Sequence, residues 1–231
     1  MTNFYKIVSS AALAALAAAD AVPLIIDTDM GFDVDDVGAV CMANELMILG
    51  EANILAIVHD TGYKLGIGGV SSINHYYGHD DIPLGAYKGE FGRADDGTGS
   101  QNNYLSDIIR RFPGPVTDYD GVPDAVETYR KALVAADDKS VHIASIGMTT
   151  NIRDLLQSQG DSISSLTGKE LVEQKVKKVV WMDMMYNFGC AEHDTSDWLG
   201  DDSGCRGSAE VAVMDMPDSV EQVFSSLGGD F

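Results

Sequence analysis

Basic residues are scarce in this sequence. Its 231 residues include 15 lysines and arginines against 36 aspartates and glutamates, which gives a formal net charge of −21. Such a chain repels the phosphates of nucleic acids, so we expect no nucleic-acid partner. Most of the carboxylates are expected on a solvated surface, and the acidic excess favours cation binding. Hydrophobic residues make up 45%, an ordinary fraction that is sufficient for one globular domain.

Cysteine is rare as well, and the three cysteines include no C-x-x-C spacing, which argues against a zinc site. Cys41 lies in an apolar helical pattern, where we expect a buried thiol. Cys190 and Cys205 flank an acidic, glycine-rich loop. An exported protein could join these two cysteines in a disulfide.

Long apolar runs are absent after the N-terminus, so we expect no membrane-spanning helix. The N-terminus itself has Lys6, a short apolar run over 7–19, and an A-x-A pattern at Ala19-Asp20-Ala21. This combination predicts a signal peptide over residues 1–21 and a mature domain over 22–231, secreted or otherwise exported through the secretory pathway. A short first helix of the domain is the alternative.

Apolar segments of strand and helix periodicity alternate along the chain, which predicts an α/β fold with a mainly parallel, Rossmann-like sheet and helices on both faces. The predicted strands are 23–26, 54–58, 82–87, 141–146, 178–182 and 220–224. The predicted helices are 37–49 (with Asp35 or Asp36 as N-cap), 70–77, 101–112, 122–136, 151–157, 169–176 and 209–214. Ligands bind at the carboxyl ends of such strands. The irregular segment 187–207 is interpreted as an active-site loop.

Five aspartates lie within ten residues, directly after the first strand and before the first helix: Asp27, Asp29, Asp33, Asp35 and Asp36. A turn and an N-cap would account for only one or two of them. Five carboxylates at one strand end repel one another unless a cation gathers them, and an all-oxygen set suits Ca²⁺ before Mg²⁺. Gly31 allows a tight turn that lets Asp29 and Asp36 face one point.

Two other acidic motifs fit less well. An EF-hand loop starting at Asp27 would need glycine at position 32 and glutamate at position 38, where this chain has Phe32 and Gly38. The phosphatases of the haloacid-dehalogenase type also begin with D-x-D after a strand. They usually continue with glycine and then threonine or valine, whereas Met30 and Gly31 follow here.

The segment 27–36, D-T-D-M-G-F-D-V-D-D, resembles the D-T-D-P-G-x-D-D motif of inosine/uridine-preferring nucleoside hydrolases, and in particular a divergent branch with D-T-D-M-G-N-D-V-D-D. Residues 143–152 are similar to the family's A-T-G-P-L-T-N-[IL] turn, and 190–194 are similar to its A-E-F-N loop. The tail 207–225 is similar to the helix and strand that follow. The resemblance covers roughly Leu24 to Gly229.

The resemblance implies a glycosidase that cleaves the N-glycosidic bond of ribonucleosides to free base and ribose, as in purine and pyrimidine salvage. In this family one Ca²⁺ holds the attacking water and the ribose hydroxyls. The implied metal ligands are Asp29, Asp36 and the carbonyl of Ile146, with Asp29 also the general base. The implied sugar contacts are Asp35, Met182, Asn187, Glu192 and Asp194. The implied partner is a small nucleoside, and a homo-oligomer is possible.

The chain also departs from the family. Asp194 stands where the family has asparagine. The family continues beyond the position of Phe231 and there supplies a further calcium-binding aspartate and a histidine that protonates the leaving base. The resemblance therefore implies a C-terminally incomplete domain of low activity. His59 follows a strand and could face the cleft, although we expect a solvated strand-end residue.

Two functional alternatives stay open. One is a catalytically weak or dead homologue that binds Ca²⁺ and ribose, and the other is a metal-dependent phosphatase. Both would use the same acidic strand end.

Export and the positions of Cys190 and Cys205 predict a disulfide that closes a 16-residue ring. Chain entropy gives such a ring about 3 kcal/mol of stabilisation. Mass spectrometry of unreduced peptides should find the two cysteines in one linked pair. Two free thiols in protein recovered from an oxidising compartment would contradict the prediction.

Overall fold

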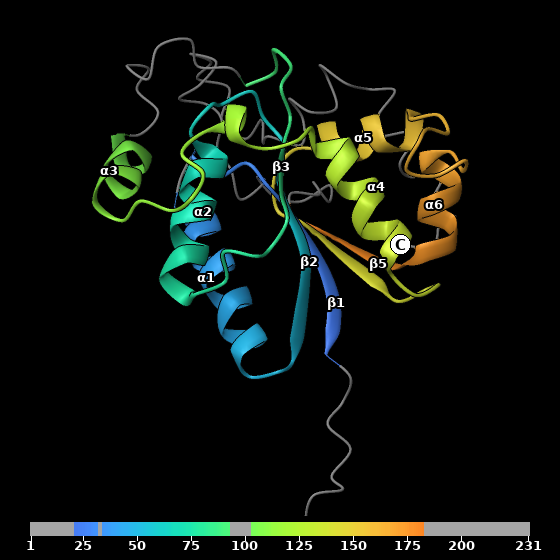
Figure 1. Ribbon diagram of the computed structural model, residues 1–231, viewed down its shortest axis with the longest axis horizontal. Helices are drawn as coiled ribbons and strands as arrows, with labels where there is room; N and C mark the ends of the chain where they lie inside the picture. Colours follow the sequence, from blue (N-terminus) through green and yellow to red (C-terminus); the bar gives the residue numbers. More distant parts are fainter. Residues whose placement is uncertain (1–20, 32–33, 93–102, 183–231) are drawn as a thin grey trace, which may run out of the picture.

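The computed structural model describes residues 21–31, 34–92 and 103–182. Its centre is a five-stranded sheet in the order β3-β2-β1-β4-β5, in which every pairing is parallel (Figure 1). The strands are β1 (Val22–Thr28), β2 (Ala52–His59), β3 (Leu84–Ala86), β4 (Val141–Ser145) and β5 (Val176–Trp181). The predicted α/β fold with a parallel sheet is confirmed.

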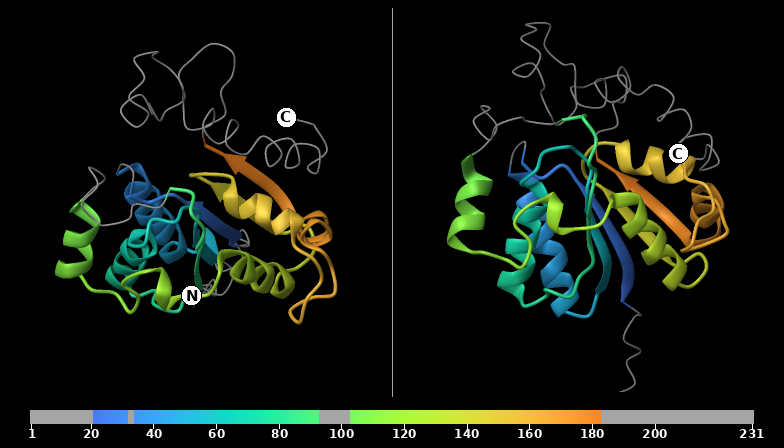
Figure 2. Two further views of the ribbon diagram at one scale, coloured as in Figure 1. Left: turned by 90° about the horizontal axis from the view of Figure 1, so that it is seen from above. Right: turned by 45° about the horizontal axis from the view of Figure 1, so that its top comes forward.

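The helices cover both faces of this sheet. They are α1 (Asp35–Ile48), α2 (Gly66–Tyr77), α3 (Asn103–Arg111), α4 (Ala125–Ala135), α5 (Thr150–Gln157) and α6 (Gly168–Lys175), with a short 3₁₀ turn at Tyr119–Gly121. Helices α1 and α2 lie on one face, with α3 packed against α2, whereas α4, α5 and α6 lie on the other (Figures 1 and 2). Parallel strands need such crossover helices, and the helices in turn bury both faces of the sheet.

The core therefore has two halves, and β1 contributes to each of them. Ile25 packs with Tyr129 and Leu133 on the α4 side, while Ile26 packs with Ile67 on the α2 side. Successive side chains of a strand point to opposite faces, so a continuous apolar run such as that of β1 is the pattern of a central strand.

Several predicted boundaries need correction. Helix α1 begins at Asp35, its N-cap is Val34, and no side chain caps it, so the predicted aspartate N-cap is wrong. Asp36 instead turns its carboxylate inward to Thr28. Helix α4 begins at Ala125 rather than at 122, because the Asp124 side chain accepts a hydrogen bond from the N–H of Val126 and forms the true N-cap.

Other predictions from the sequence are confirmed only in part. Strand β3 spans only Leu84–Ala86 of the predicted 82–87. Cys41 is half-buried against the α2-side core rather than fully buried. The helix and strand predicted at 209–214 and 220–224 lie outside the described residues. Among the described helices, none has the length and apolar character needed to cross a membrane.

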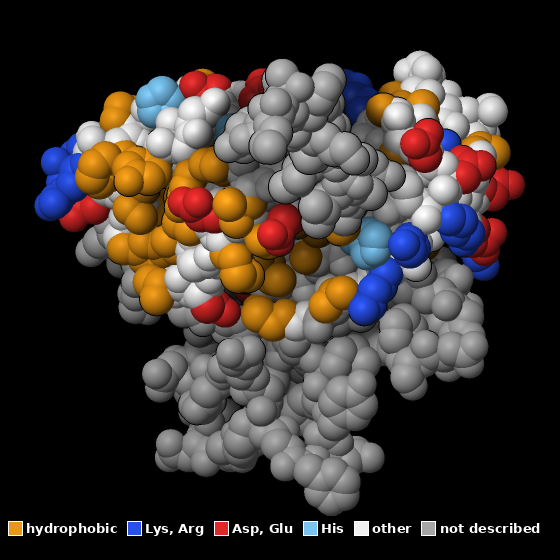
Figure 3. All heavy atoms as spheres, turned by 90° about the horizontal axis from the view of Figure 1, so that it is seen from below, with side chains coloured by type: hydrophobic (Ala, Val, Ile, Leu, Met, Phe, Trp, Pro, Cys, Tyr) orange, Lys and Arg blue, Asp and Glu red, His pale blue; other side chains and the backbone are white. Residues whose placement is uncertain are grey.

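Large hydrophobic side chains are exposed at the end of the molecule where the strands begin. Met42, Ile48 and Leu49 in and just after the C-terminal half of α1, and Tyr76 near the end of α2, are all exposed. Figure 3 shows hydrophobic side chains gathered on this underside, with acidic side chains between them. The carboxyl ends of the strands, where ligands are expected, lie at the opposite end (Figure 1).

Candidate functional site

The carboxyl ends of β1, β2 and β4 lie side by side, because β1 pairs with both neighbours in parallel. The backbone continues to pair beyond the strands. The N–H of Asp60 donates to the carbonyl of Thr28 at 3.0 Å, and the N–H of Ile146 donates to the carbonyl of Asp27 at 2.8 Å. Residues that directly follow these three strands therefore meet at one edge of the sheet.

The structure separates the aspartates of the first motif into different environments. Asp27, Asp29 and Asp36 are at most 1% exposed, whereas Asp35 is exposed and accepts a hydrogen bond from the N–H of Asp36. Asp36 returns to the end of β1, where the Thr28 hydroxyl donates to its carboxylate. Asp33 lies outside the described residues. Two of the predicted ligands, Asp29 and Asp36, are thus buried at the same strand end.

The turn between β1 and α1 depends on Gly31. This residue has a φ of 134°, a backbone conformation that side-chain-bearing residues rarely adopt. A Cβ atom there would also stand 2.7 Å from the ring of Tyr63. The predicted need for glycine at this position is confirmed.

Asp27 is bound inside the protein by two side-chain donors. The Tyr129 hydroxyl donates to one carboxylate oxygen and the Asn151 amide to the other, each at 2.8 Å. Burial raises the pKa of Asp27 to about 7, and the two hydrogen bonds oppose this shift. Because both oxygens are used in this way, Asp27 is an anchor for the neighbouring elements rather than an open ligand.

Asp60 is the residue that sequence reasoning missed. Its side chain is fully buried, and neither carboxylate oxygen has a hydrogen-bond partner among the described residues. Burial, followed by the charges of Asp27, Asp29 and Asp36, raises its pKa well above the ordinary value. The backbone N–H of Met148 lowers this pKa in part, although its geometry does not meet that of a normal hydrogen bond to the Asp60 carboxylate. The available signal was its position directly after an apolar strand.

The second motif packs directly onto this acidic edge. A Cβ atom at Gly147 would stand 2.4 Å from a carboxylate oxygen of Asp60 and 2.5 Å from the backbone nitrogen of Asp29, so only glycine fits between them. Thr150 donates its hydroxyl to the carbonyl of Asp60, and Asn151 also donates to the carbonyl of His59 at 3.1 Å. The turn after β4 thereby holds the ends of β1 and β2 together.

His59 differs from the expected solvated residue, because it is only 1% exposed. Its Nδ1 lies 3.0 Å from the carbonyl oxygen of Thr61 and its Nε2 lies 3.1 Å from that of Met30. Burial lowers the pKa of His59 to about 4, so the ring is neutral at pH 7 and carries one N–H. Both nitrogens face backbone carbonyls, which argues against His59 as the acid for a leaving group.

The remaining predicted site residues fall into two groups. Ile146 and Met182 follow β4 and β5 and are half-buried, and the N–H of Met182 donates to the carbonyl of Ser145 at 2.8 Å. They therefore share the edge with Asp29 and Asp36. The other predicted residues lie outside the described residues, namely Asn187, Glu192 and Asp194, together with Cys190 and Cys205.

The donor set at this edge has the chemistry of a hard-cation site. The side chains of Asp29, Asp36 and Asp60 offer only carboxylate oxygens. The two oxygens of Asp60 are buried without a hydrogen-bond partner among the described residues, and a bound cation would compensate for this. Within the described part of the chain, however, no three histidine, cysteine, aspartate or glutamate side chains already form a metal-binding group. Cation binding would have to draw these carboxylates together.

No protein-family model matches the sequence, and no curated protein matches it. Solved structures do match its fold. The type III effector protein XopQ, complexed with adenosine diphosphate ribose, is 14% identical with a TM-score of 0.58, over 89% of this chain and 53% of that one. A plant nucleoside hydrolase is 15% identical with a TM-score of 0.56, over 89% of this chain and 57% of that one.

A purine-preferring ribonucleoside hydrolase from Gardnerella vaginalis is 18% identical with a TM-score of 0.53, over 88% of this chain and 58% of that one. The chain thus spans a little over half the length of the solved structures that it matches. These likenesses establish a nucleoside-hydrolase-like fold.

Tyr129→Phe removes a hydroxyl donor from Asp27, and we expect the free energy of unfolding to fall by about 1–3 kcal/mol. Because the folded-state pKa of Asp27 is raised, to about 7, the folded protein holds this proton more tightly than the unfolded chain, and stability is lost as the pH rises through that value. The variant raises this pKa further. Urea unfolding should therefore show a larger loss at pH 8 than at pH 6.

The matched control is Tyr76→Phe, because Tyr76 is exposed. Its effect should stay within about 0.5 kcal/mol at both pH values. A Tyr129→Phe loss that is the same at pH 6 and pH 8 would mean that the hydroxyl does not act through the charge of Asp27.

Proposed function

We propose that this chain hydrolyses the N-glycosidic bond of ribonucleosides and releases free base and ribose. One observation carries the proposal: buried carboxylates gather at the carboxyl edge of a nucleoside-hydrolase-like sheet, in the segment whose sequence resembles the motif of those enzymes. Burying several acidic groups at one edge is costly unless they bind a cation or do chemistry.

In this proposal Asp29, Asp36 and the carbonyl of Ile146 hold a Ca²⁺ ion, and Asp60 is a fourth oxygen donor beside them. The ion, when bound, lowers the pKa of a water molecule and orients it. Asp29 would be the general base for that water, and it would need the help of the ion because a carboxylate by itself is too weak a base for free water. Asp27 keeps β1, α4 and α5 in register through Tyr129 and Asn151.

The sugar is proposed to lie over the same edge. Asp35, which is exposed in the first turn of α1, would accept hydrogen bonds from ribose hydroxyls, and Met182 would line the sugar. Asn187, Glu192 and Asp194 complete the proposed contacts. As the bond to the base breaks, positive charge develops on the sugar ring, and the surrounding carboxylates stabilise it.

A second candidate is a protein that binds Ca²⁺ and ribose without efficient turnover. The observation that favours it is His59, which is neutral, buried and engaged at both nitrogens, so that it is unavailable to protonate the base. A general acid contributes roughly 10²–10⁴-fold to such reactions. One fold neighbour was crystallised with adenosine diphosphate ribose, a ribose-containing ligand. A metal-dependent phosphatase is the third candidate.

Export through the secretory pathway and the formation of a homo-oligomer stay predictions.

The first test is reducing-sugar release from inosine and uridine, beside phosphate release from a phosphate monoester, with Ca²⁺ and with chelator. We expect sugar release from the nucleosides that chelator abolishes. Asp29→Asn should lower it at least 10²-fold through loss of the base, whereas Asp137→Asn, on the exposed surface, should not. Ribose binding without sugar release would favour the second candidate, and phosphate release alone would favour the third.

The second test is Ca²⁺ binding by calorimetry and by thermal unfolding. Calcium should raise the melting temperature by mass action, Asp36→Ala should abolish the rise, and Asp60→Asn should reduce it. Burial and the neighbouring carboxylates raise the pKa of Asp60, so this carboxyl holds its proton more tightly than an ordinary one, and cation binding should release protons into the buffer. Titration in two buffers of different protonation enthalpy measures that release. Absence of both binding heat and a melting-temperature shift would refute the cation site.

A further inference from the structure

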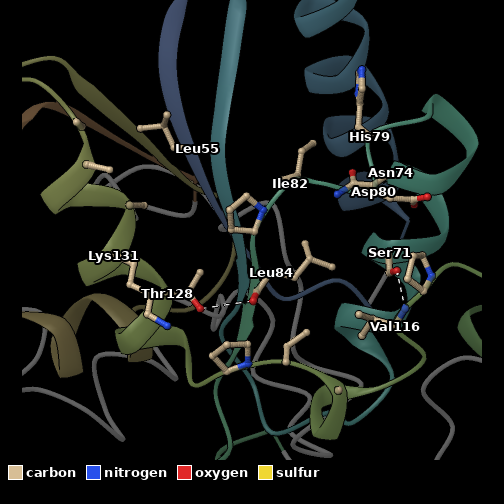
Figure 4. A pocket seen from close by; sticks show the side chains of 18 residues that line it. Leu55, Ser71, Asn74, His79, Asp80, Ile82, Leu84, Val116, Thr128 and Lys131 are labelled. Carbon is tan, nitrogen blue, oxygen red and sulfur yellow. Dashed lines mark hydrogen bonds between the residues drawn. The ribbon is translucent and has the colours of Figure 1, made fainter. Parts of the chain in front are cut away.

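A cavity of about 530 Å³ lies along β3, between α2 and α4 (Figure 4). Its walls come from α2, the segment 79–84, the segment 115–123 and α4. None of the acidic residues at the carboxyl edge lines it, so it is separate from the site described above. Its volume is in the range of small-molecule binding sites.

The body of the cavity is apolar and rigid. Ile82, Leu84, Val116 and Val122 contribute aliphatic side chains, and α4 contributes small ones such as Ala132. Three prolines also line it, at positions 83, 115 and 123, and each fixes the backbone φ where it stands. The cavity is thus largely formed before any ligand enters.

One end of the cavity carries a buried donor, the amide of Asn74. The side chain is 2% exposed, and its Nδ2 has no hydrogen-bond partner among the described residues. Buried N–H groups are almost always bonded in folded proteins. In Figure 4 the amide nitrogen is turned to the side of Ile82, into the cavity.

A chain of hydrogen bonds sets the orientation of this amide. The Asn44 amide donates to the carbonyl of Val40 at 2.9 Å, which identifies its nitrogen, and the same nitrogen donates to Oδ1 of Asn74 at 3.0 Å. His79 Nδ1 donates to Oδ1 of Asn44 at 2.7 Å. Oδ1 of Asn74 is therefore occupied, and its two N–H groups are what the cavity presents.

The other polar lining groups already have partners. Ser71 accepts a hydrogen bond from the N–H of Val116 at 3.1 Å, and the Thr128 hydroxyl lies 3.1 Å from the carbonyl oxygen of Asp124 and 3.5 Å from that of Leu84 (Figure 4). The charged lining side chains are paired outside the cavity, Lys131 with Glu127 at 2.6 Å and Asp80 with His75 at 3.0 Å. The lining therefore selects for neither an anion nor a cation.

We propose that this cavity binds a neutral small molecule with an apolar body and one carbonyl oxygen, which accepts a hydrogen bond from Nδ2 of Asn74. The apolar walls supply affinity by burying the body of the ligand. The single open donor supplies specificity, because a ligand without an acceptor leaves it unsatisfied. This site is independent of the proposed hydrolytic function.

The test uses ¹⁵N-labelled protein and two probes of similar shape, 4-phenylbutan-2-one and butylbenzene, of which only the ketone carries an acceptor. The ketone should shift the Asn74 side-chain amide resonances and those of cavity-lining residues in a saturable way. It should bind at least 10-fold more tightly than the hydrocarbon. Asn74→Asp, which keeps the shape but loses the donors, should remove this difference.

Ala132→Phe, which fills the cavity from α4, should abolish ketone binding, and Val134→Phe, on the exposed side of the same helix, should preserve it. These two variants leave the Asn74 network intact, so they decide the question even if Asn74→Asp fails to fold. Equal affinity for the two probes, or ketone shifts that persist in Ala132→Phe, would overturn the proposal and leave a water-filled or unspecific cavity.

Discussion

The burial of carboxylates at the ends of the two central strands is the constraint on which the rest of this structure depends. Asp27, Asp29, Asp36 and Asp60 are all at most 1% exposed. Burial raises the pKa values of Asp27 and Asp60, and the charges of Asp27, Asp29 and Asp36 raise that of Asp60 further. The protein satisfies Asp27 with its own donors, whereas the oxygens of Asp60 have no hydrogen-bond partner among the described residues.

The fold tolerates this arrangement because distant segments brace the same edge. Asn151, in the first turn of α5, contacts both the Asp27 carboxylate and the His59 carbonyl, and Tyr129 reaches Asp27 from α4. Gly147 leaves room for Asp29 and Asp60 to approach the same turn. The glycine, threonine and asparagine of the second sequence motif are thus explained by their contacts with the first motif and with the end of β2, which hold the strand ends together.

The molecule also separates two kinds of chemistry in space. Acidic groups that suit a hard cation lie at the carboxyl ends of β1 and β2, where parallel sheets usually bind ligands. The neutral, mainly apolar cavity lies along β3, and a hydrogen-bonded network of side chains turns one amide into it. A cation and an uncharged ligand could therefore be bound at the same time without competing for any residue.

The sequence by itself determined the fold class and the place of the acidic edge. Alternating apolar segments of two periodicities specify a parallel sheet between helices, and an aspartate motif directly after β1 must lie at the carboxyl end of that strand. Gly31 was also predictable, because a tight turn between strand and helix demands its conformation.

Only the tertiary structure decided which polar residues are buried. Asp35 and Asp36 are adjacent in sequence, yet one is exposed and the other is buried beside Thr28. His59 and Asp60 end an ordinary apolar strand, and they are buried because Met30, Gly66 and the turn at Gly147 pack over them. Burial of this kind depends on contacts between segments tens of residues apart, which local periodicity does not encode.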